Sequence, residues 1–139
     1  MITIEEVNTR PQMMEIFEVR RKVFVIEQEV DPKEEYDEFE ESSKHFLAKH
    51  NGIICGTCRI RNTSKGIKLE RFAVLKSYRG KGVGAALVVK CLEELNNAST
   101  TKYLHAQLHA IPFYEKYGFK CTGPQFEEAG IQHFKMIID

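Results

Sequence analysis

Arg79-Gly80-Lys81-Gly82-Val83-Gly84 separates a strand-like run at residues 67–75 from a helix-like run at residues 83–95. Three glycines at the start of a helix leave backbone N–H groups uncovered, and these amides together with the helix dipole favour a bound anion. The stretch therefore predicts a site for a phosphorylated ligand. It is not a P-loop, because no Gly-Lys-Ser/Thr follows, and its spacing fits a dinucleotide-binding fingerprint poorly.

The pattern around this loop predicts an α/β fold with a mixed sheet, in a single domain over residues 1–139. The expected order is β-α-β-β-β-α-β-α-β-β. Asn51-Gly52 predicts a tight hairpin turn, and residues 31–43, with seven carboxylates, are interpreted as a solvated loop or short helix. Helices are expected at residues 9–28, with Thr9 as cap and Pro11 in the first turn, and at 83–95 and 111–117. Strands are expected at residues 2–7, 45–50, 53–60, 67–75, 103–108, 119–122 and 131–138.

The composition limits the classes of protein to which the chain can belong. The chain has 139 residues, of which 20 are basic and 20 acidic, so its formal net charge is zero. This balance argues against a broad charged surface for nucleic acid or membrane. No apolar run approaches the ~20 residues of a membrane span, and the N-terminus lacks the features of a signal peptide. We therefore expect a cytoplasmic protein with reduced cysteines.

Two pairs of residues have a spacing that is also found in metal sites. Cys55 and Cys58 form a CxxC pair, but no second CxxC or histidine pair completes a zinc site. An offset of three in a strand also predicts that the two thiols point to opposite faces. His105 and His109 have the spacing of a helical metal pair, but they fall on a predicted strand and its exit. We expect no metal.

Two motifs in this order resemble the GNAT superfamily of acyl-CoA N-acyltransferases. The superfamily signature Arg/Gln-x-x-Gly-x-Gly/Ala is complete at residues 79–84. Ala110-Ile-Pro-Phe-Tyr-Glu-Lys-Tyr-Gly-Phe119 resembles the second signature, Ala-x-x-Phe-Tyr-x-x-x-Gly-Phe. The segments at 20–28, 105–107 and 128–136 are similar to a compact bacterial branch that includes glyphosate N-acetyltransferase. The resemblance covers nearly the whole chain.

The resemblance implies acetyl-CoA as co-substrate. The strand before the loop would hold the pantetheine arm through its amides, and the loop would hold the pyrophosphate. Gln107 is interpreted as hydrogen-bonding either the cofactor or the sheet. The expected cofactor-binding residues are Phe72, Ala73, Val74, Arg79, Gly80, Lys81, Gly82, Val83, Gly84 and Gln107.

Tyr114 is the expected general acid for the leaving CoA sulfur. A phenol with an ordinary pKa of ~10 stays protonated at neutral pH, which suits it to donate a proton. The alternative is a structural aromatic position in a short helix. Of the adjacent pair, Phe113 is expected to be the core residue.

His133 is the expected general base, because the resemblance places it where glyphosate N-acetyltransferase has its catalytic histidine. A histidine can accept an ammonium proton near neutral pH. The alternative is a half-buried, hydrogen-bonded histidine in a late strand. Glu70 is the rival base, because many members of the superfamily use a carboxylate on this strand, and it is also a plausible partner for a neighbouring cation.

Arg20 and Arg71 are the expected substrate-binding residues. The resemblance implies this because an arginine at the place of Arg71 binds the acidic substrate of glyphosate N-acetyltransferase, and Arg20 matches an arginine of its first helix. Strand alternation predicts that Arg71 points to the face opposite Glu70. Two arginines at one cleft favour an acceptor with a carboxylate or phosphate. The alternative is that both arginines form salt bridges with the acidic residues 34–41.

The leading hypothesis is an acetyl-CoA-dependent N-acetyltransferase that acts on a primary amine of a small metabolite, with acidic metabolites among the candidates, by direct attack in a ternary complex. The first alternative is acetylation of a protein or peptide. The second is a non-catalytic acyl-CoA-binding module. The resemblance also makes a homodimer plausible, whereas nucleic acid and membrane are not expected partners.

Overall fold

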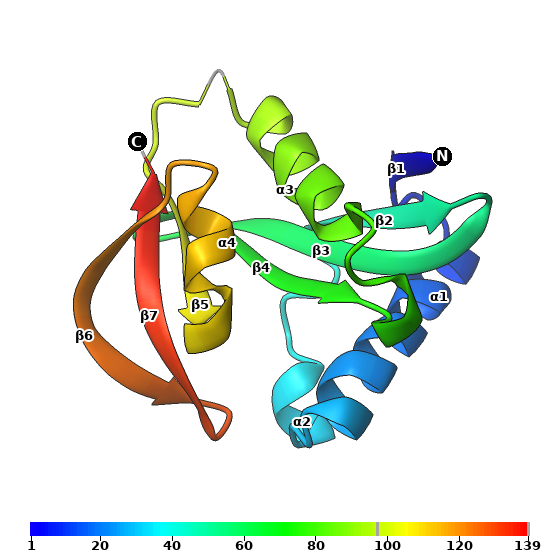
Figure 1. Ribbon diagram of the computed structural model, residues 1–139, viewed down its shortest axis with the longest axis horizontal. Coiled ribbons are helices and arrows are strands. Elements are labelled where there is room, and N and C mark those ends of the chain that lie inside the picture. The colour runs from blue at the N-terminus through cyan, green and yellow to red at the C-terminus, as the bar shows by residue number, and fades with distance from the viewer. Residues whose placement is uncertain (97, 139) are drawn as a thin grey trace.

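The computed structural model describes residues 1–96 and 98–138. Seven strands form one mixed sheet in the order β1-β2-β3-β4-β5-β7-β6 (Figure 1). The strands are β1 (Ile2–Glu6), β2 (Lys44–His50), β3 (Ile53–Thr63), β4 (Gly66–Val74), β5 (Lys102–Gln107), β6 (Lys120–Glu128) and β7 (Ile131–Ile138). The helices are α1 (Arg10–Arg20), the π-helix η1 (Arg21–Glu27), α2 (Pro32–Glu35), the 3-10 turns η2 (Lys76–Tyr78) and η3 (Leu108–Ala110), α3 (Val83–Glu94) and α4 (Ile111–Glu115).

The predicted mixed α/β sheet and its order of elements are confirmed, and local signals account for several boundaries. Thr9 caps α1 by accepting from the amide of Gln12, whose side chain accepts from the Thr9 amide in return. This capping box satisfies two otherwise free N–H groups. The helix then continues as η1 up to Gln28, and Asn51 and Gly52 take positive φ values in the hairpin turn between β2 and β3.

The strands β4 and β5 are the only part of the described sheet with parallel pairing. They pair at Ile67 with Lys102 and at Lys68 with Tyr103, and beyond these positions they diverge (Figure 1). The edge of β4 that faces β5 therefore carries backbone groups with no strand partner along its second half. The candidate site lies at this opening between β4 and β5.

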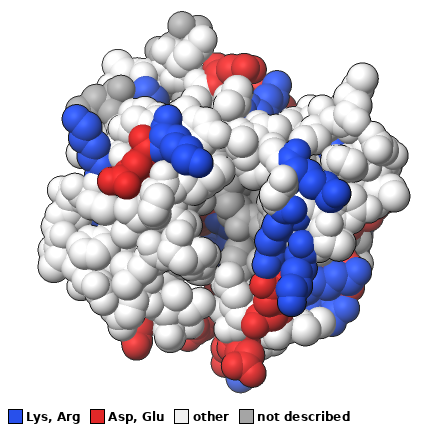
Figure 2. Space-filling model, viewed as in Figure 1, with Lys and Arg blue, Asp and Glu red and all other residues white. Residues whose placement is uncertain are grey.

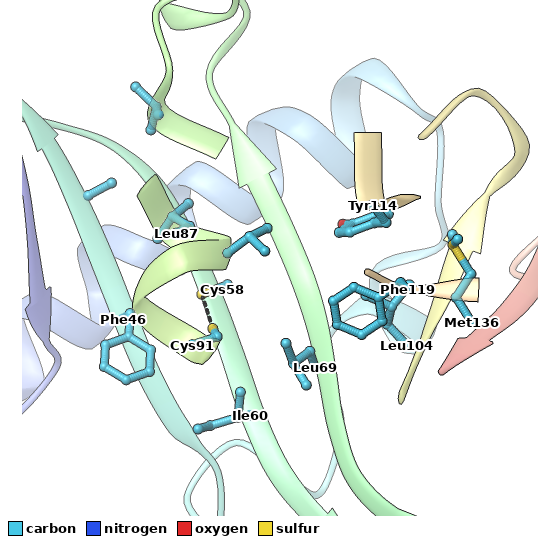
Figure 3. Packing of buried hydrophobic residues seen from close by; sticks show 14 of the residues in the cluster. Phe46, Cys58, Ile60, Leu69, Leu87, Cys91, Leu104, Tyr114, Phe119 and Met136 are labelled. Carbon is cyan, nitrogen blue, oxygen red and sulfur yellow. Dashed lines mark hydrogen bonds between the residues drawn. The ribbon is translucent and has the colours of Figure 1, made fainter. Parts of the chain in front are cut away.

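The main core lies between the sheet and the pair α3 and α4. Leu87 and Cys91 of α3 pack with Cys58 of β3, Leu69 of β4 and Tyr114 of α4 (Figure 3). The sulfur atoms of Cys58 and Cys91 lie 3.5 Å apart. A smaller cluster from α1 and η1 covers the other face of the sheet. Both faces are thus buried, which fixes the backbone of β4 from both sides.

The prediction that Cys55 and Cys58 point to opposite faces is wrong, since both are fully buried in the same core cluster. The cause is a bulge in β3. Ala48 of β2 pairs with Gly56, but the next residue of β2 pairs with Ile54, so one residue of β3 is left over. An extra residue resets the alternation of side chains along a strand.

One further strand differs from prediction, whereas the acidic segment holds the short helix that was one of its two predicted forms. β6 runs to Glu128 rather than ending at residue 122, because a shift in register between Thr122 and Phe126 accommodates Gly123 and Pro124. In the acidic segment, Asp31 caps the one-turn helix α2 through the amide of residue 33. None of the helices in the described residues is long and apolar enough to cross a membrane.

Candidate active site

A cleft of about 480 Å³ lies where β4 and β5 diverge. Its walls come from η1, the segment around α2, β4, β5, β7 and α4. It brings together several residues predicted from the sequence: Glu70, Arg71, Phe72, Gln107, Tyr114 and His133.

A bulge in β4 shapes one wall of the cleft. Arg71 and Phe72 together lie opposite the single residue Cys58 of β3, and Arg71 adopts φ +59°. A non-glycine residue in this region marks a locally strained backbone. The bulge cancels the alternation of side chains, so Glu70 and Arg71 both line the cleft. The prediction that they point to opposite faces is therefore wrong.

Tyr114 is packed into the cleft wall. Its side chain is buried, and its ring makes edge contacts with Phe72 at 5.8 Å and with Phe119 at 6.1 Å between centroids. Phe113 is the more exposed of the pair, contrary to prediction. Burial raises the pKa of the Tyr114 phenol well above its ordinary value, because the phenolate is the form that desolvation disfavours. The phenol is therefore protonated throughout the neutral range.

His133 is held in one tautomer. Its Nδ1 lies 2.7 Å from the carbonyl oxygen of Ile131, and a carbonyl can only accept, so Nδ1 carries the proton. Nε2 is therefore the atom with the free lone pair. The ring is buried and stacks on Phe126 at 5.7 Å between centroids. Such fixation leaves Nε2 ready to accept a proton.

Glu128 lies between two histidines. Its Oε1 is 3.0 Å from Nδ1 of His105, and its Oε2 is 3.9 Å from Nε2 of His133. The hydrogen bond with His105 is the main cause that lowers the pKa of Glu128. An ionised carboxylate beside His133 can stabilise an imidazolium that forms there.

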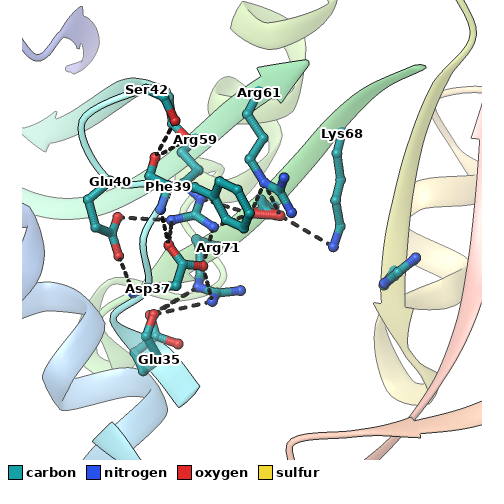
Figure 4. Close-up of polar contacts among 12 residues, drawn as sticks. Glu35, Asp37, Phe39, Glu40, Ser42, Arg59, Arg61, Lys68 and Arg71 are labelled. Carbon is teal, nitrogen blue, oxygen red and sulfur yellow. Dashed lines mark hydrogen bonds and ion pairs between the residues drawn. The ribbon is translucent and has the colours of Figure 1, made fainter. Parts of the chain in front are cut away.

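Glu70 belongs to a buried ion-pair network (Figure 4). It pairs with Arg59, with Arg61 at 3.1 Å and with Lys68 at 3.3 Å. Burial opposes its ionisation, but the charges of Arg59 and Lys68 outweigh this effect and hold the pKa of Glu70 at about 2. A carboxylate that is this acidic and this fully paired is a poor acceptor for an ammonium proton.

Arg20 lies outside the cleft lining. Its guanidinium is 1% exposed and pairs with Glu35 at 2.7 Å and with Glu40 at 2.8 Å. Arg71 lines the cleft, but it donates to Asp37 at 3.2 Å and to the Glu35 carbonyl. Both arginines thus make the salt bridges with the acidic segment that were the alternative to a substrate-binding role.

The glycine loop presents open backbone. Gly80 and Gly82 have φ values of +77° and +89°, which side chains rarely adopt. The first intrahelical bond of α3 runs from the Ala86 amide to the Gly82 carbonyl, so the preceding helical amides point out of the helix end. Figure 2 shows a hollow near the centre of this face, with Lys and Arg side chains gathered along one side. The loop therefore fits an anionic group.

Three other residues predicted to hold the cofactor have protein partners. Arg79 donates to the Val74 carbonyl at 2.9 Å and pairs with Glu27 at 2.6 Å. Gln107 donates to the side chain of Gln28 at 2.9 Å, which joins β5 to the end of η1. Ala73 packs against α1 and η1. Arg79 and Gln107 therefore support the walls of the site in this structure.

Arg61, Lys68, His105 and Glu128 line the cleft but had no predicted role there. The sequence did carry a signal for Arg61 and Lys68. Lys68 and Glu70 are two residues apart in one strand, and Arg59 and Arg61 are two residues apart in the strand before it. Alternating charges on neighbouring strands indicate a shared polar face. Glu128 carried no such signal, because the strand that contains it was predicted to end at residue 122.

Comparisons with known proteins show the family and the fold of the chain. A family model described as acetyltransferase (GNAT) domain matches residues 9–139. An uncharacterized N-acetyltransferase of Bacillus subtilis, YjcF, is 39% identical over 131 residues, covering 92% of this chain and 93% of the relative. The crystal structure of Escherichia coli ElaA has a TM-score of 0.88 at 27% identity and covers both chains completely. An acyl-CoA N-acyltransferase from Pseudomonas aeruginosa has a TM-score of 0.85 at 25% identity and covers 99% of this chain and 97% of its own.

Proposed function

The chain belongs to the acetyltransferase (GNAT) family, and from that premise we propose that it transfers an acetyl group from acetyl-CoA to a primary amine of a small metabolite. The observation that carries this proposal is the cleft between β4 and β5, which is lined by both Tyr114 and His133. A proton donor and a proton acceptor in one cleft are what acetyl transfer to an amine requires.

The residues around the glycine loop fit CoA. The open amides at the start of α3 and the positive φ values of Gly80 and Gly82 suit a pyrophosphate, which binds well at helix N-termini. The exposed side chain of Lys81 adds a positive charge beside them. The unpaired edge of β4 at residues 72–74 offers backbone groups to the amides of the pantetheine arm.

His133 acts as the general base in this proposal. Nε2 takes a proton from the acceptor ammonium, and the neutral amine attacks the acetyl carbonyl. The resulting imidazolium faces Glu128, whose Oε2 is 3.9 Å away. Glu70 does not compete for this role, because its three cationic partners keep it ionised and occupied.

Tyr114 acts as the general acid. Its raised pKa keeps the phenol protonated, so it can donate to the sulfur as the carbon–sulfur bond breaks. No cysteine is among the described residues that line the cleft, which favours direct attack over a covalent intermediate. A cytoplasmic location, a homodimer and the likeness to glyphosate N-acetyltransferase stay predictions from the sequence.

The experiment that tests this function is an assay of thiol release from acetyl-CoA in the presence and absence of amines. We expect release to depend on the amine and the acceptor to be N-acetylated. Binding of acetyl-CoA without amine-dependent release would contradict the proposal.

A further inference from the structure

We propose that the acceptor is an anionic amine, whose carboxylate or phosphate binds between Arg61 and Lys68 at the closed end of the cleft. This inference rests on the proposed function, and it names the class of substrate. Both side chains line the cleft and both pair with Glu70, and Figure 4 shows Arg61 and Lys68 close to each other.

Arg61 is held in place with most of its donors free. Its guanidinium carbon lies 4.0 Å from the centroid of the Phe39 ring, and its Nε donates to Glu70 at 3.1 Å. Neither terminal nitrogen, Nη1 or Nη2, has a hydrogen-bond partner among the described residues. The side chain is 17% exposed and lines the cleft, so these donors are accessible from the cleft. A fixed guanidinium with two free nitrogens is suited to pair with both oxygens of a carboxylate or phosphate.

Lys68 places a second cation next to Arg61. Its Nζ lies 3.3 Å from Oε1 of Glu70, and its side chain is 13% exposed. An ammonium has three donors, so one contact leaves two available. Because Lys68 pairs with Tyr103 in the sheet, this cation lies where β4 and β5 are still joined, at the closed end of the opening.

Arg61 and Lys68 share a single carboxylate in their direct contacts. Glu70 supplies one negative charge to three cations, Arg59, Arg61 and Lys68. Arg59 also pairs with two further carboxylates, so it needs little from Glu70, but Arg61 and Lys68 share Glu70 alone in their direct contacts. Among the other ionisable groups that line the cleft, Arg71 pairs with Glu35 and Asp37, and Glu128 hydrogen-bonds His105. The charge of Lys68 also reaches Glu128 and helps to lower its pKa, and Glu34 lies on the cleft lining, but neither carboxylate is in direct contact with Lys68 or Arg61. Two partly buried cations that share one directly bound carboxylate keep donors available for an anion.

The position of this anion site fits the reaction. Alternation along β5 puts Tyr103, His105 and Gln107 on one face of the sheet, and Gln107 pairs with His133 of β7. Lys68 and His133 therefore lie on the same face of the sheet and both line the cleft, as do His105 and Glu128. An acceptor with its anion at Lys68 would direct its amine toward His133. Amino acids and aminoalkyl phosphates have this layout.

The test compares matched acceptors with the wild-type protein. Each amino acid is paired with its amide, and each aminoalkyl phosphate with its amino alcohol, which separates the two sources of negative charge. We expect the anionic member of at least one kind of pair to have the higher kcat/KM by roughly tenfold or more, the effect of one charge-assisted hydrogen bond. Equal or better use of the neutral member in both kinds of pair would overturn the inference while leaving acetyl transfer intact.

Two variants locate the site, with a control on the same hairpin. Arg61→Gln and Lys68→Met should each raise KM for the anionic acceptor roughly tenfold or more, with kcat for that acceptor little changed. The same variants should leave kcat/KM for the neutral acceptor of each pair nearly unchanged. A general loss of structure would instead lower kcat/KM for both acceptors. Lys65→Met, at the exposed turn between β3 and β4, should alter neither value. Equal losses for anionic and neutral acceptors, or no rise in KM, would overturn the assignment.

A binding measurement separates this inference from the proposed function. Calorimetry with the N-acetyl derivative of the preferred acid and with its amide reports on the anion site without any turnover. We expect the acid to bind more tightly and Arg61→Gln to abolish the difference. If the acid binds more tightly than its amide but thiol release does not depend on the amine, only the proposed function is contradicted. If thiol release depends on the amine but the acid does not bind more tightly, only the anion site is contradicted.

Discussion

His133 donates its Nδ1 proton to the carbonyl oxygen of Ile131 at 2.7 Å, which leaves the lone pair on Nε2. The two residues lie two positions apart on β7, so the strand itself fixes the tautomer. Nε2 then lies 3.9 Å from the carboxylate of Glu128. This arrangement is that of a base with its counter-ion already in place, and it separates His133 from the other candidate, Glu70.

Replacing His133 should remove the base. We expect His133→Ala to lower kcat by roughly 100-fold or more, the usual contribution of general base catalysis, and to abolish the acidic limb of the pH–rate profile. Glu70→Gln should keep that limb, because the pKa of Glu70 is about 2 and the group stays ionised across the assay range. The measurement is kcat against pH for both variants.

His50→Ala, on β2 and outside the cleft lining, serves as the matched control for the loss of a histidine. Its profile should match that of the wild type. Retention of the acidic limb in His133→Ala together with its loss in Glu70→Gln would reverse the assignment of the base.

Tyr114→Phe should lower kcat by more than roughly tenfold, because the leaving thiolate then has no proton donor. The affinity for acetyl-CoA, measured by calorimetry, should change little. Burial keeps Tyr114 protonated well into the alkaline range, so any basic limb of the profile belongs to another group and should persist in the variant. Tyr117→Phe, outside the cleft lining in the same segment, is the control. Unaltered turnover in Tyr114→Phe would rule out its role as the acid.

Two glycines of the loop should respond in opposite ways. Gly82 has φ +89°, where a side chain costs about 1–2 kcal/mol, so Gly82→Ala should disturb the loop and raise KM for acetyl-CoA roughly tenfold. Gly84 lies in α3, and a methyl group there would make only ordinary contacts, 3.6 Å from Phe113. Gly84→Ala should stabilise the helix by about 1 kcal/mol and leave KM little changed. Equal effects of the two substitutions on KM would contradict the assignment of the loop.

The ion-pair network should make the protein sensitive to acid. Asp37 and Glu70 both have pKa values of about 2, below their ordinary values, because Arg59 and its neighbours outweigh burial. A carboxyl whose pKa is lower in the folded state stabilises the fold above its unfolded pKa, and this stabilisation is lost as the pH falls from about 4 toward 2. Glu70 alone should contribute about 3 kcal/mol at neutral pH.

Urea unfolding at several pH values measures this effect. Glu70→Gln should lower the free energy of unfolding at pH 7 by about 3 kcal/mol and flatten its decline between about pH 4 and pH 2. If the free energy of unfolding of Glu70→Gln fell with decreasing pH as steeply as that of the wild type, the stabilising role of the ion-pair network would be contradicted.

The elements predicted well are those that local chemistry determines. Thr9 with Gln12 starts a helix, Asn51-Gly52 closes a hairpin, and the glycines at 80–84 precede α3. Each signal lies within a few residues of the structure it specifies. The bulges at Cys55 and Arg71 could not be predicted in this way, because a bulge is defined by the register of a partner strand.

The candidate site was predicted only in part for the same reason. The motifs identified Tyr114, His133 and the glycine loop, but the partners of the charged residues come from distant segments. Arg20 is paired with Glu35 and Glu40, and Glu70 is surrounded by three cations, which only the folded chain brings together. Pairing decides which charges are available to a ligand, and it leaves Arg61 and Lys68 as the better candidates.

The central claim is that the cleft catalyses acetyl transfer from acetyl-CoA to an amine. The most direct test follows free thiol and acceptor mass together over a panel of amino acids, aminoalkyl phosphates, polyamines, amino sugars and peptides. We predict thiol release that depends on the amine, with an equal amount of N-acetylated acceptor and a preference for small anionic amines. Tight binding of acetyl-CoA with no amine-dependent release from any member of the panel would contradict it and would favour a non-catalytic acyl-CoA-binding module.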